Sequence, residues 1–226
     1  IMTGSPRNDY FFNLPNSQSI SLRKKLNIPE DAPVILLAST FILPSYDNLN
    51  DDSEILEAMK RAVFNSVDCF KNVYLIVKPH PGENEDETKS FSSKNPNIKF
   101  IPRTEDIRPF IKLCNAFVSF GSTTTLDAII LDKLVICPAF SGWNWNNAYI
   151  SPKAVHSPIT AKEIKHIFEA ISKFNHSYLI NKTSKQREKL LKNWIYRNDG
   201  LGAQRIGNLA LDIIQNKDQF MKPKAL

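Results

Sequence analysis

Within residues 116–127, AFVSFGSTTTLD, a largely apolar run gives way to a glycine and four hydroxyl residues. The first five residues have the length and composition of a buried β-strand, and the glycine allows a sharp turn of the backbone. Ser and Thr are favoured at the start of a helix, because their side chains bond N–H groups that the first turn leaves unpaired. The stretch therefore predicts a strand over 116–120, a turn at Gly121 and a helix after it.

Strand-like and helix-like patterns alternate on both sides of this stretch. Four other short apolar runs predict buried strands, at residues 34–38, 73–77, 98–101 and 134–137. Between them, apolar residues recur at every fourth position over 55–67, an acidic helix begins at about Glu83, and a short helix covers 107–114. This alternation predicts parallel βαβ units and an α/β fold with a doubly wound, Rossmann-like parallel sheet.

After about residue 158 the pattern is helical throughout. Thr160 and Glu163 have the spacing of a capping box, in which a hydroxyl and a carboxylate bond the N–H groups at a helix start. A basic helix is expected over 184–197 and a last amphipathic helix over 206–214, with Gly200 and Gly202 between them. The chain is thus predicted to be a single domain, 1–226, made of an entry segment (1–33), an α/β core (34–158) and added C-terminal helices (159–226).

Composition excludes several classes of protein. The chain has 226 residues, of which 42% are hydrophobic and 23% charged, as in ordinary globular proteins and unlike disordered or fibrous ones. No apolar run approaches the roughly 18 residues that a membrane span needs. Three cysteines without close spacing predict reduced thiols, and four isolated histidines give a metal site no basis. The net charge of +6 suits an anionic partner, but its basic residues are interleaved with acidic ones, so nucleic-acid binding has little support.

The candidate ligand site lies at the carboxyl ends of the strands. In an open parallel sheet, ligands bind there, at the point where the strand order reverses, so the loops after residues 38, 77 and 120 are the ones to inspect. Hydroxyls and unpaired N–H groups at Gly121, Ser122, Thr123 and Thr124 favour a phosphate. The alternative is that Ser122 or Thr123 is only a helix cap, which accounts for one hydroxyl and not for four. Asp127 lies one turn further, where a carboxylate accepts from ribose hydroxyls or merely complements the helix dipole.

The loop after the second strand carries a second polar signal, Lys78-Pro79-His80-Pro81. The prolines restrict the backbone, so the loop would hold a cationic Lys78 and a hydrogen-bonding His80 in place beside a phosphate. The alternative is that both are ordinary solvated surface residues. In the loop after the fifth strand, Trp143 and Trp145 either stack on a sugar or base or, slightly favoured, cover a domain edge.

Taken together, these loops resemble the C-terminal, donor-nucleotide-binding domain of glycosyltransferases of the B fold (GT-B). The similarity is nearest to bacterial surface and capsular polysaccharide transferases, including those that resemble the CDP-glycerol glycerophosphotransferases. The matching segments are residues 3–7, 77–81, 119–128, 133–138 and 199–206, so the resemblance extends over nearly the whole chain.

The resemblance implies a transferase that moves a sugar or polyol from a nucleotide-activated donor to an acceptor hydroxyl. The donor diphosphate would lie against Gly121, Ser122, Thr123 and Thr124, with Lys78 and His80 beside it. Asp127 stands where a ribose-binding Glu is common in such families.

Further contacts follow from the same resemblance. Arg7 would approach the phosphates, and Ile101 and Arg103 would contact the base. From its place in the loop after the fifth strand, Trp143 is a further candidate to contact the base or the sugar. No metal and no other cofactor is implied, and no residue of this chain is assigned as the catalytic base.

Enzymes of this kind have a further N-terminal half that binds the acceptor. By the resemblance, residues 1–33 enter from that half, and the chain is about half of the working enzyme. The expected partner is a nucleotide-sugar donor and not a nucleic acid, and the expected location is the cytoplasm, at the inner face of the membrane.

Two alternatives remain open. A non-hydrolysing UDP-N-acetylglucosamine 2-epimerase shares the fold, but typically has Asp-Ser-Gly-Gly where this chain has Phe120-Gly121-Ser122-Thr123. A non-catalytic nucleotide-binding module is the alternative of another class.

Overall fold

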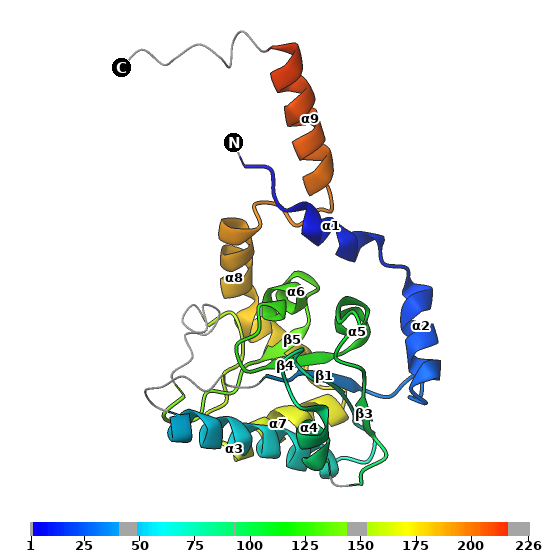
Figure 1. The fold of residues 1–226 in the computed structure, drawn as a ribbon, viewed down its shortest axis with the longest axis vertical. Coiled ribbons are helices and arrows are strands. Elements are labelled where there is room, and N and C mark those ends of the chain that lie inside the picture. Colours follow the sequence, from blue (N-terminus) through cyan, green and yellow to red (C-terminus); the bar gives the residue numbers. More distant parts are fainter. Residues whose placement is uncertain (1, 41–48, 93, 144–152, 217–226) are drawn as a thin grey trace.

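Five parallel strands form the centre of the computed structural model, which describes residues 2–40, 49–92, 94–143 and 153–216. They are β1 (Val34–Ala38), β2 (Tyr74–Lys78), β3 (Ile98–Phe100), β4 (Ala116–Ser119) and β5 (Leu134–Ile136). Their order is β3-β2-β1-β4-β5, and every neighbouring pair is parallel. The strand order therefore reverses between β1 and β4, which are neighbours as the sequence predicted (Figure 1).

Different helices cover the two faces of the sheet, because alternate side chains of a strand point to opposite sides. On one face, Ile35 and Leu37 pack with apolar residues of α3 (Leu49–Asp68) and α7 (Ala161–Ser172). On the other, Leu36 and Phe117 pack with α5 (Arg108–Leu113) and α6 (Thr124–Ile130). Figure 1 shows α3 and α7 below the sheet and α5 and α6 above it, so the doubly wound α/β fold is confirmed.

Local capping decides where several helices begin. Thr160 caps α7, and its hydroxyl accepts from the Glu163 N–H at 3.2 Å, while the Glu163 carboxylate accepts from Ile159 N–H at 2.7 Å. The acidic helix, α4 (Glu85–Ser90), begins at Glu85 and not at 83, because the Asn84 side chain accepts from Asp86 N–H and sets the cap there.

The basic helix predicted over 184–197 is wrong at both ends. It is α8 (Ser177–Trp194), and its first turn carries Leu179, which is buried in the core beside α7. Leu179, with the partly buried Ile180 beside it, packs on the core and extends the helix toward its N-terminus. The last helix, α9 (Gly202–Gln215), likewise starts four residues before Ile206.

The entry segment forms two helices that the sequence did not indicate, α1 (Pro6–Asn13) and α2 (Asn16–Lys25). α2 packs on α5, and α1 packs on α9. The Asp9 carboxylate joins the ends of the chain, because it accepts from the N–H groups of Gly202 at 2.9 Å and Ala203 at 2.7 Å.

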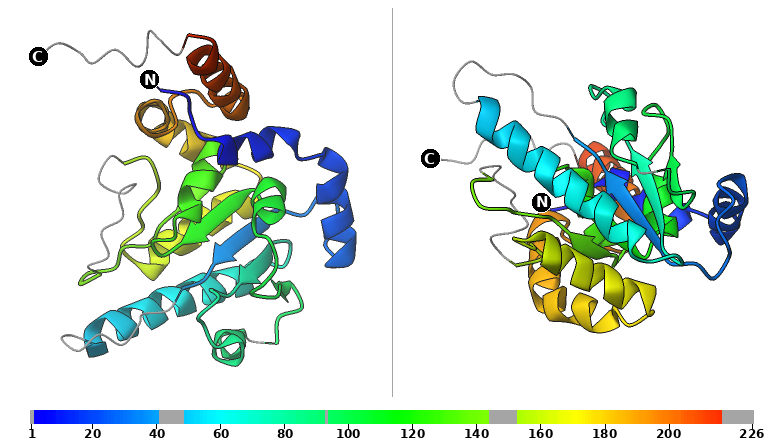
Figure 2. Two further views of the ribbon diagram at one scale, coloured as in Figure 1. Left: turned by 45° about the horizontal axis from the view of Figure 1, so that its top comes forward. Right: turned by 90° about the horizontal axis from the view of Figure 1, so that it is seen from below.

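α9 lies away from the sheet, beyond α1, in Figure 1 and in the left view of Figure 2. Several of its apolar side chains are exposed: Ile206, Leu211, Ile213 and Ile214. Among the helices of the described residues, none combines the length and the apolar character needed to cross a bilayer.

Candidate functional site

A cleft of about 400 Å³ opens at the carboxyl ends of β1 and β2. Six residues that the sequence indicated line it together, although they come from three separate loops: Lys78, His80, Arg103, Ser122, Thr123 and Thr124. Sequence reasoning missed Ser39, Glu105 and Asp106, which also line the cleft. Ser39 directly follows β1, so its place at the end of a buried strand was a usable signal.

The hydroxyl turn between β4 and α6 forms one wall. Gly121 has a φ of +121°, a backbone conformation in which a residue with a side chain would be strained. The buried Ser119 hydroxyl accepts from the N–H groups of Gly121 at 3.3 Å and Ser122 at 2.9 Å, and so holds the turn from below.

The four hydroxyls after Gly121 have different surroundings. The Ser122 and Thr124 hydroxyls bond each other at 2.7 Å, and Thr123, the cap residue of α6, makes no capping bond with its side chain. These three residues line the cleft, whereas Thr125 is fully buried. Three hydroxyls of the run thus lie at the cleft, two of them bonded to each other.

Lys78 holds two loops together. Lys78 is 9% exposed, and its ammonium group donates to the Arg103 carbonyl oxygen at 2.7 Å, which ties the loop after β3 to the end of β2. Burial lowers the pKa of Lys78, and the nearby carboxylates of Asp106, Glu105 and Glu85 oppose that change. Lys78 therefore shapes the cleft in addition to bringing it positive charge.

His80 lies in a tight turn that its own ring helps to close. The His80 carbonyl accepts from Glu83 N–H at 2.9 Å, as in a β-turn with Pro81 at its favoured second position. The ring Nδ1 accepts from Gly82 N–H at 3.1 Å, so the neutral ring carries its proton on Nε2. The neutral ring therefore has its donor at Nε2.

A buried carboxylate, Glu83, lies behind this turn and was missed by sequence reasoning. It accepts from the His80 N–H at 3.0 Å and from the Ser39 hydroxyl at 2.8 Å, and it forms a buried ion pair with Lys60. Lys60 lies four residues after Leu56 and three before Val63, on the apolar side of α3. A lysine at a core-facing position was the signal that could have revealed the pair.

Arg7 and Asp127 bond each other and do not line the cleft. Arg7 Nη2 lies 3.1 Å from Asp127 Oδ2, and the Asp127 side chain is only 4% exposed. Burial raises the pKa of Asp127, and the Arg7 guanidinium opposes that shift. The ribose contact of Asp127 and the phosphate contact of Arg7 stay predictions.

One of the two acids that do line the cleft, Asp106, is held by Arg108. Burial disfavours its ionisation, but hydrogen bonds from Arg108, at 2.9 to 3.1 Å, outweigh burial and hold the pKa of Asp106 below its ordinary value. Asp106 is therefore a carboxylate at neutral pH, and it offers acceptors to ligand hydroxyls or amino groups at this end of the cleft.

Two residues expected to contact base or sugar lie away from the cleft. Ile101 is buried in the core, and its N–H donates to the Val77 carbonyl at 3.0 Å. Trp143 packs against the α3 side of the core. Trp145 lies outside the described residues.

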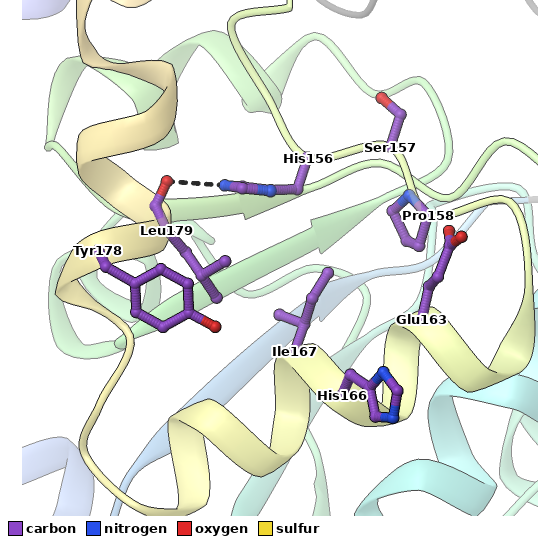
Figure 3. A pocket seen from close by; sticks show the side chains of 8 residues that line it. All are labelled: His156, Ser157, Pro158, Glu163, His166, Ile167, Tyr178 and Leu179. Atoms are coloured by element: carbon purple, nitrogen blue, oxygen red, sulfur yellow. Dashed lines mark hydrogen bonds between the residues drawn. The ribbon is translucent and has the colours of Figure 1, made fainter.

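A second cavity, of about 290 Å³, lies between the chain after β5 and helices α7 and α8 (Figure 3). Its polar side chains include His156, Glu163, His166 and Tyr178, and none of the predicted site residues lines it. The His156 ring donates from Nε2 to the Leu179 carbonyl at 2.8 Å, so this nitrogen is engaged in linking the segment to α8. In the described parts of the chain, no cluster of three or more His, Cys, Asp or Glu residues has the arrangement of a metal site.

The model of the CDP-glycerol:poly(glycerophosphate) glycerophosphotransferase family matches residues 1–211 of the chain. Curated proteins gave no match.

Solved structures with the same fold include the wall teichoic acid polymerase TagF, with 15% identity, a TM-score of 0.64 and coverage of 96% of this chain and 53% of that one. A glycosyltransferase from Rickettsia africae ESF-5 matches with 15% identity, a TM-score of 0.59 and coverage of 94% and 56%. UDP-GlcNAc 2-epimerase from Neisseria meningitidis, bound to UDP-GlcNAc, matches with 14% identity, a TM-score of 0.61 and coverage of 94% and 55%. The chain thus spans about half the length of these proteins.

Proposed function

The chain belongs to the CDP-glycerol:poly(glycerophosphate) glycerophosphotransferase family, and from this premise we propose that it is the donor-binding half of a transferase that uses a CDP-linked polyol. The acceptor would be a hydroxyl group of a growing surface polymer. The family match supports a nucleotide-activated donor, and it favours cytidine over the other bases.

In this proposal the cleft at the ends of β1 and β2 holds the donor diphosphate. Thr123 and one hydroxyl of the bonded pair Ser122 and Thr124 donate to it, and the His80 ring donates from Nε2. Lys78 and Arg103 bring positive charge to the same space. When the acceptor hydroxyl attacks the distal phosphorus, the anhydride bond breaks and the nucleoside monophosphate leaves, and these donors stabilise the charge that develops on it.

The observation that carries the proposal is the convergence of these groups. Residues from three loops, far apart in the sequence, meet around one space of about 400 Å³ at the strand ends. That location is where doubly wound sheets bind nucleotides.

Calorimetry of the 226-residue chain with CDP, CMP, UDP and GDP tests the proposal. We expect CDP to bind most tightly, because the second phosphate reaches the donors of the cleft and the base is cytosine. Thr123→Val should weaken CDP binding about tenfold, the effect of one hydrogen bond to a charged group. Failure of all four nucleotides to bind would exclude a donor site.

Lys78→Ala should weaken binding more than Thr123→Val does, because it removes a charge and also releases the Arg103 loop. Lys165→Ala is the matched control, because Lys165 is an exposed lysine of α7 that does not line the cleft. Equal effects of Lys78→Ala and Lys165→Ala would show that Lys78 has no part in the site.

The epimerase is the second candidate, because a UDP-GlcNAc 2-epimerase shares the fold. If the chain were part of an epimerase, UDP-GlcNAc would bind more tightly than CDP and would be converted to its 2-epimer. The non-catalytic module predicts nucleotide binding without release of CMP when CDP-glycerol and acceptor are supplied to the full-length protein.

An acceptor-binding half elsewhere in a longer protein is also part of the proposal. It is supported by the chain's coverage of about half of its structural relatives, and by the exposed apolar side chains of α9, which a further domain would cover. A cytoplasmic location at the inner face of the membrane belongs to the same proposal.

A further inference from the structure

We propose that Glu83 is a positioning residue, whose buried carboxylate holds the His80 turn in place for the ligand of the cleft. The proposal rests on the proposed function in one respect, namely that the cleft binds a nucleotide diphosphate.

Glu83 is the point where three separate elements meet. It accepts from Ser39, which follows β1, from Lys60 of α3, and from the backbone N–H of His80, which follows β2. Glu83 is 4% exposed, Lys60 6% and Ser39 4%. Ser39 and His80 also line the cleft, whereas Lys60 and Glu83 line a neighbouring cavity on the α3 side. The carboxylate thus lies directly behind the cleft wall.

Stability alone is a poor reason for such a pair. Burying two charges costs desolvation energy, and apolar side chains of similar volume often serve a fold equally well or better. What an apolar pair does not supply is an acceptor for the His80 N–H and the Ser39 hydroxyl. The ion pair therefore fits a role in orienting the cleft wall.

The turn depends on Glu83 at both ends. The Glu83 N–H donates to the His80 carbonyl at 2.9 Å, and the Glu83 carboxylate accepts from the His80 N–H at 3.0 Å. These two bonds set the direction of the chain at His80. The ring is then fixed by Gly82 N–H, which donates to Nδ1 at 3.1 Å and leaves the proton on Nε2. Glu83 acts on the ligand through the direction of this ring, without touching the ligand itself.

The test is a double-mutant cycle on CDP affinity, measured by calorimetry. Because changing Glu83 alone leaves the Lys60 ammonium buried without a counter-charge, the main variant is the neutral pair Lys60→Met/Glu83→Met, which also removes the acceptor of the His80 N–H. It is made with His80 present and again with His80→Ala. Glu57→Gln is the control. Glu57 is on α3, as Lys60 is, but it forms an ion pair with Arg61 on the exposed side of that helix.

We expect the neutral pair to weaken CDP binding about tenfold when His80 is present and less than about twofold in the His80→Ala background, the non-additivity of coupled groups. Glu57→Gln should leave the affinity unchanged. An equal loss in both backgrounds, or no loss in either, would overturn the positioning role.

A second measurement does not need the ligand. In the wild-type chain the ¹⁵N resonances of the His80 ring should show the tautomer protonated on Nε2, and the neutral pair should shift them toward the averaged values of a mobile ring. Unchanged resonances in the neutral pair would overturn the proposal even if no nucleotide binds. If CDP fails to bind while the resonances shift, the proposed function fails and the positioning role stands.

Discussion

At the scale of single residues, buried polar groups fix the loops around the sheet. Ser119 accepts from the N–H groups of the turn that follows it, Glu83 accepts from Ser39, 44 residues away, and His156 donates to the Leu179 carbonyl, 23 residues away. Such contacts are specific to one loop conformation, because a buried polar group without its partner is costly. The loops of this protein are therefore held by a few polar side chains.

His156 makes stability depend on pH. Burial lowers its pKa, its bond to the Leu179 carbonyl opposes that shift, and Lys182 and Arg187 lower it further. The unfolded chain then binds the proton more readily than the folded one, so the free energy of unfolding falls as pH drops below about 6.5, the ordinary pKa of histidine. His176, whose pKa is also lowered by burial, acts in the same direction.

We expect the free energy of unfolding, measured with urea, to be lower at pH 5.5 than at pH 7.5. His156→Gln keeps a donor for Leu179 and should reduce this difference. His166→Gln, a change at an exposed histidine of α7, serves as the control and should leave it as in the wild type. Parallel pH profiles for wild type and His156→Gln would contradict the prediction.

At the scale of elements, one long side chain of α8, that of Arg187, helps to join the helix to the edge of the sheet. The Arg187 guanidinium is buried, lies 3.0 Å from Asp132 Oδ1, and donates to the Lys133 carbonyl at 2.7 Å. These contacts link the helix to the turn between α6 and β5, where Asp132 has a φ of +53°. Arg187 thus fixes the position of α8 beside the edge of the sheet.

Arg187→Met should lower the free energy of unfolding by about 1–3 kcal/mol, because the Lys133 carbonyl loses its donor while the apolar stem is kept. Chemical denaturation measures the change, with Lys189→Met, at an exposed position of α8, as the matched control. A loss no greater than that of the control would mean that the arginine contributes no net stability.

At the scale of the whole molecule, a ligand in the cleft should stabilise the fold, because the cleft joins loops from both halves of the sheet. If the native state alone binds CDP, a concentration of 100 times Kd adds about 2.7 kcal/mol to the free energy of unfolding. For a chain of this size the melting temperature should rise by about 5–10 °C. Differential scanning calorimetry gives the shift; CMP at the same concentration should give a smaller one, and no shift with CDP would count against the site.

The sequence was informative about the sheet and much less so about the contacts behind the cleft. β1 and β4 were predictable, because short apolar runs between polar loops have few other structures open to them. That Lys78 and Ser122 would lie near each other at a ligand site was predictable, because parallel strands bring the loops that follow them to one edge of the sheet.

Partnerships between distant residues were not predictable. Lys60 and Glu83 are 23 residues apart, and Arg7 and Asp127 are 120 apart, and no local pattern encodes which charges meet. The entry helices α1 and α2 were missed for a related reason. Their residues are mostly polar, and they are helical next to α9 and α5, on which they pack.

The bond between Asp9 and the start of α9 has a consequence for synthesis of the protein on the ribosome. Its partners, Gly202 and Ala203, follow Asp9 by 193 and 194 residues. At about 5–20 residues per second, translation reaches them roughly 10–40 s after Asp9. During that interval α1 lacks this docking site, so the βαβ core can form first and the two ends join last. A chain that ends at residue 201 should have a sheet that resists protease while α1 is still cleaved.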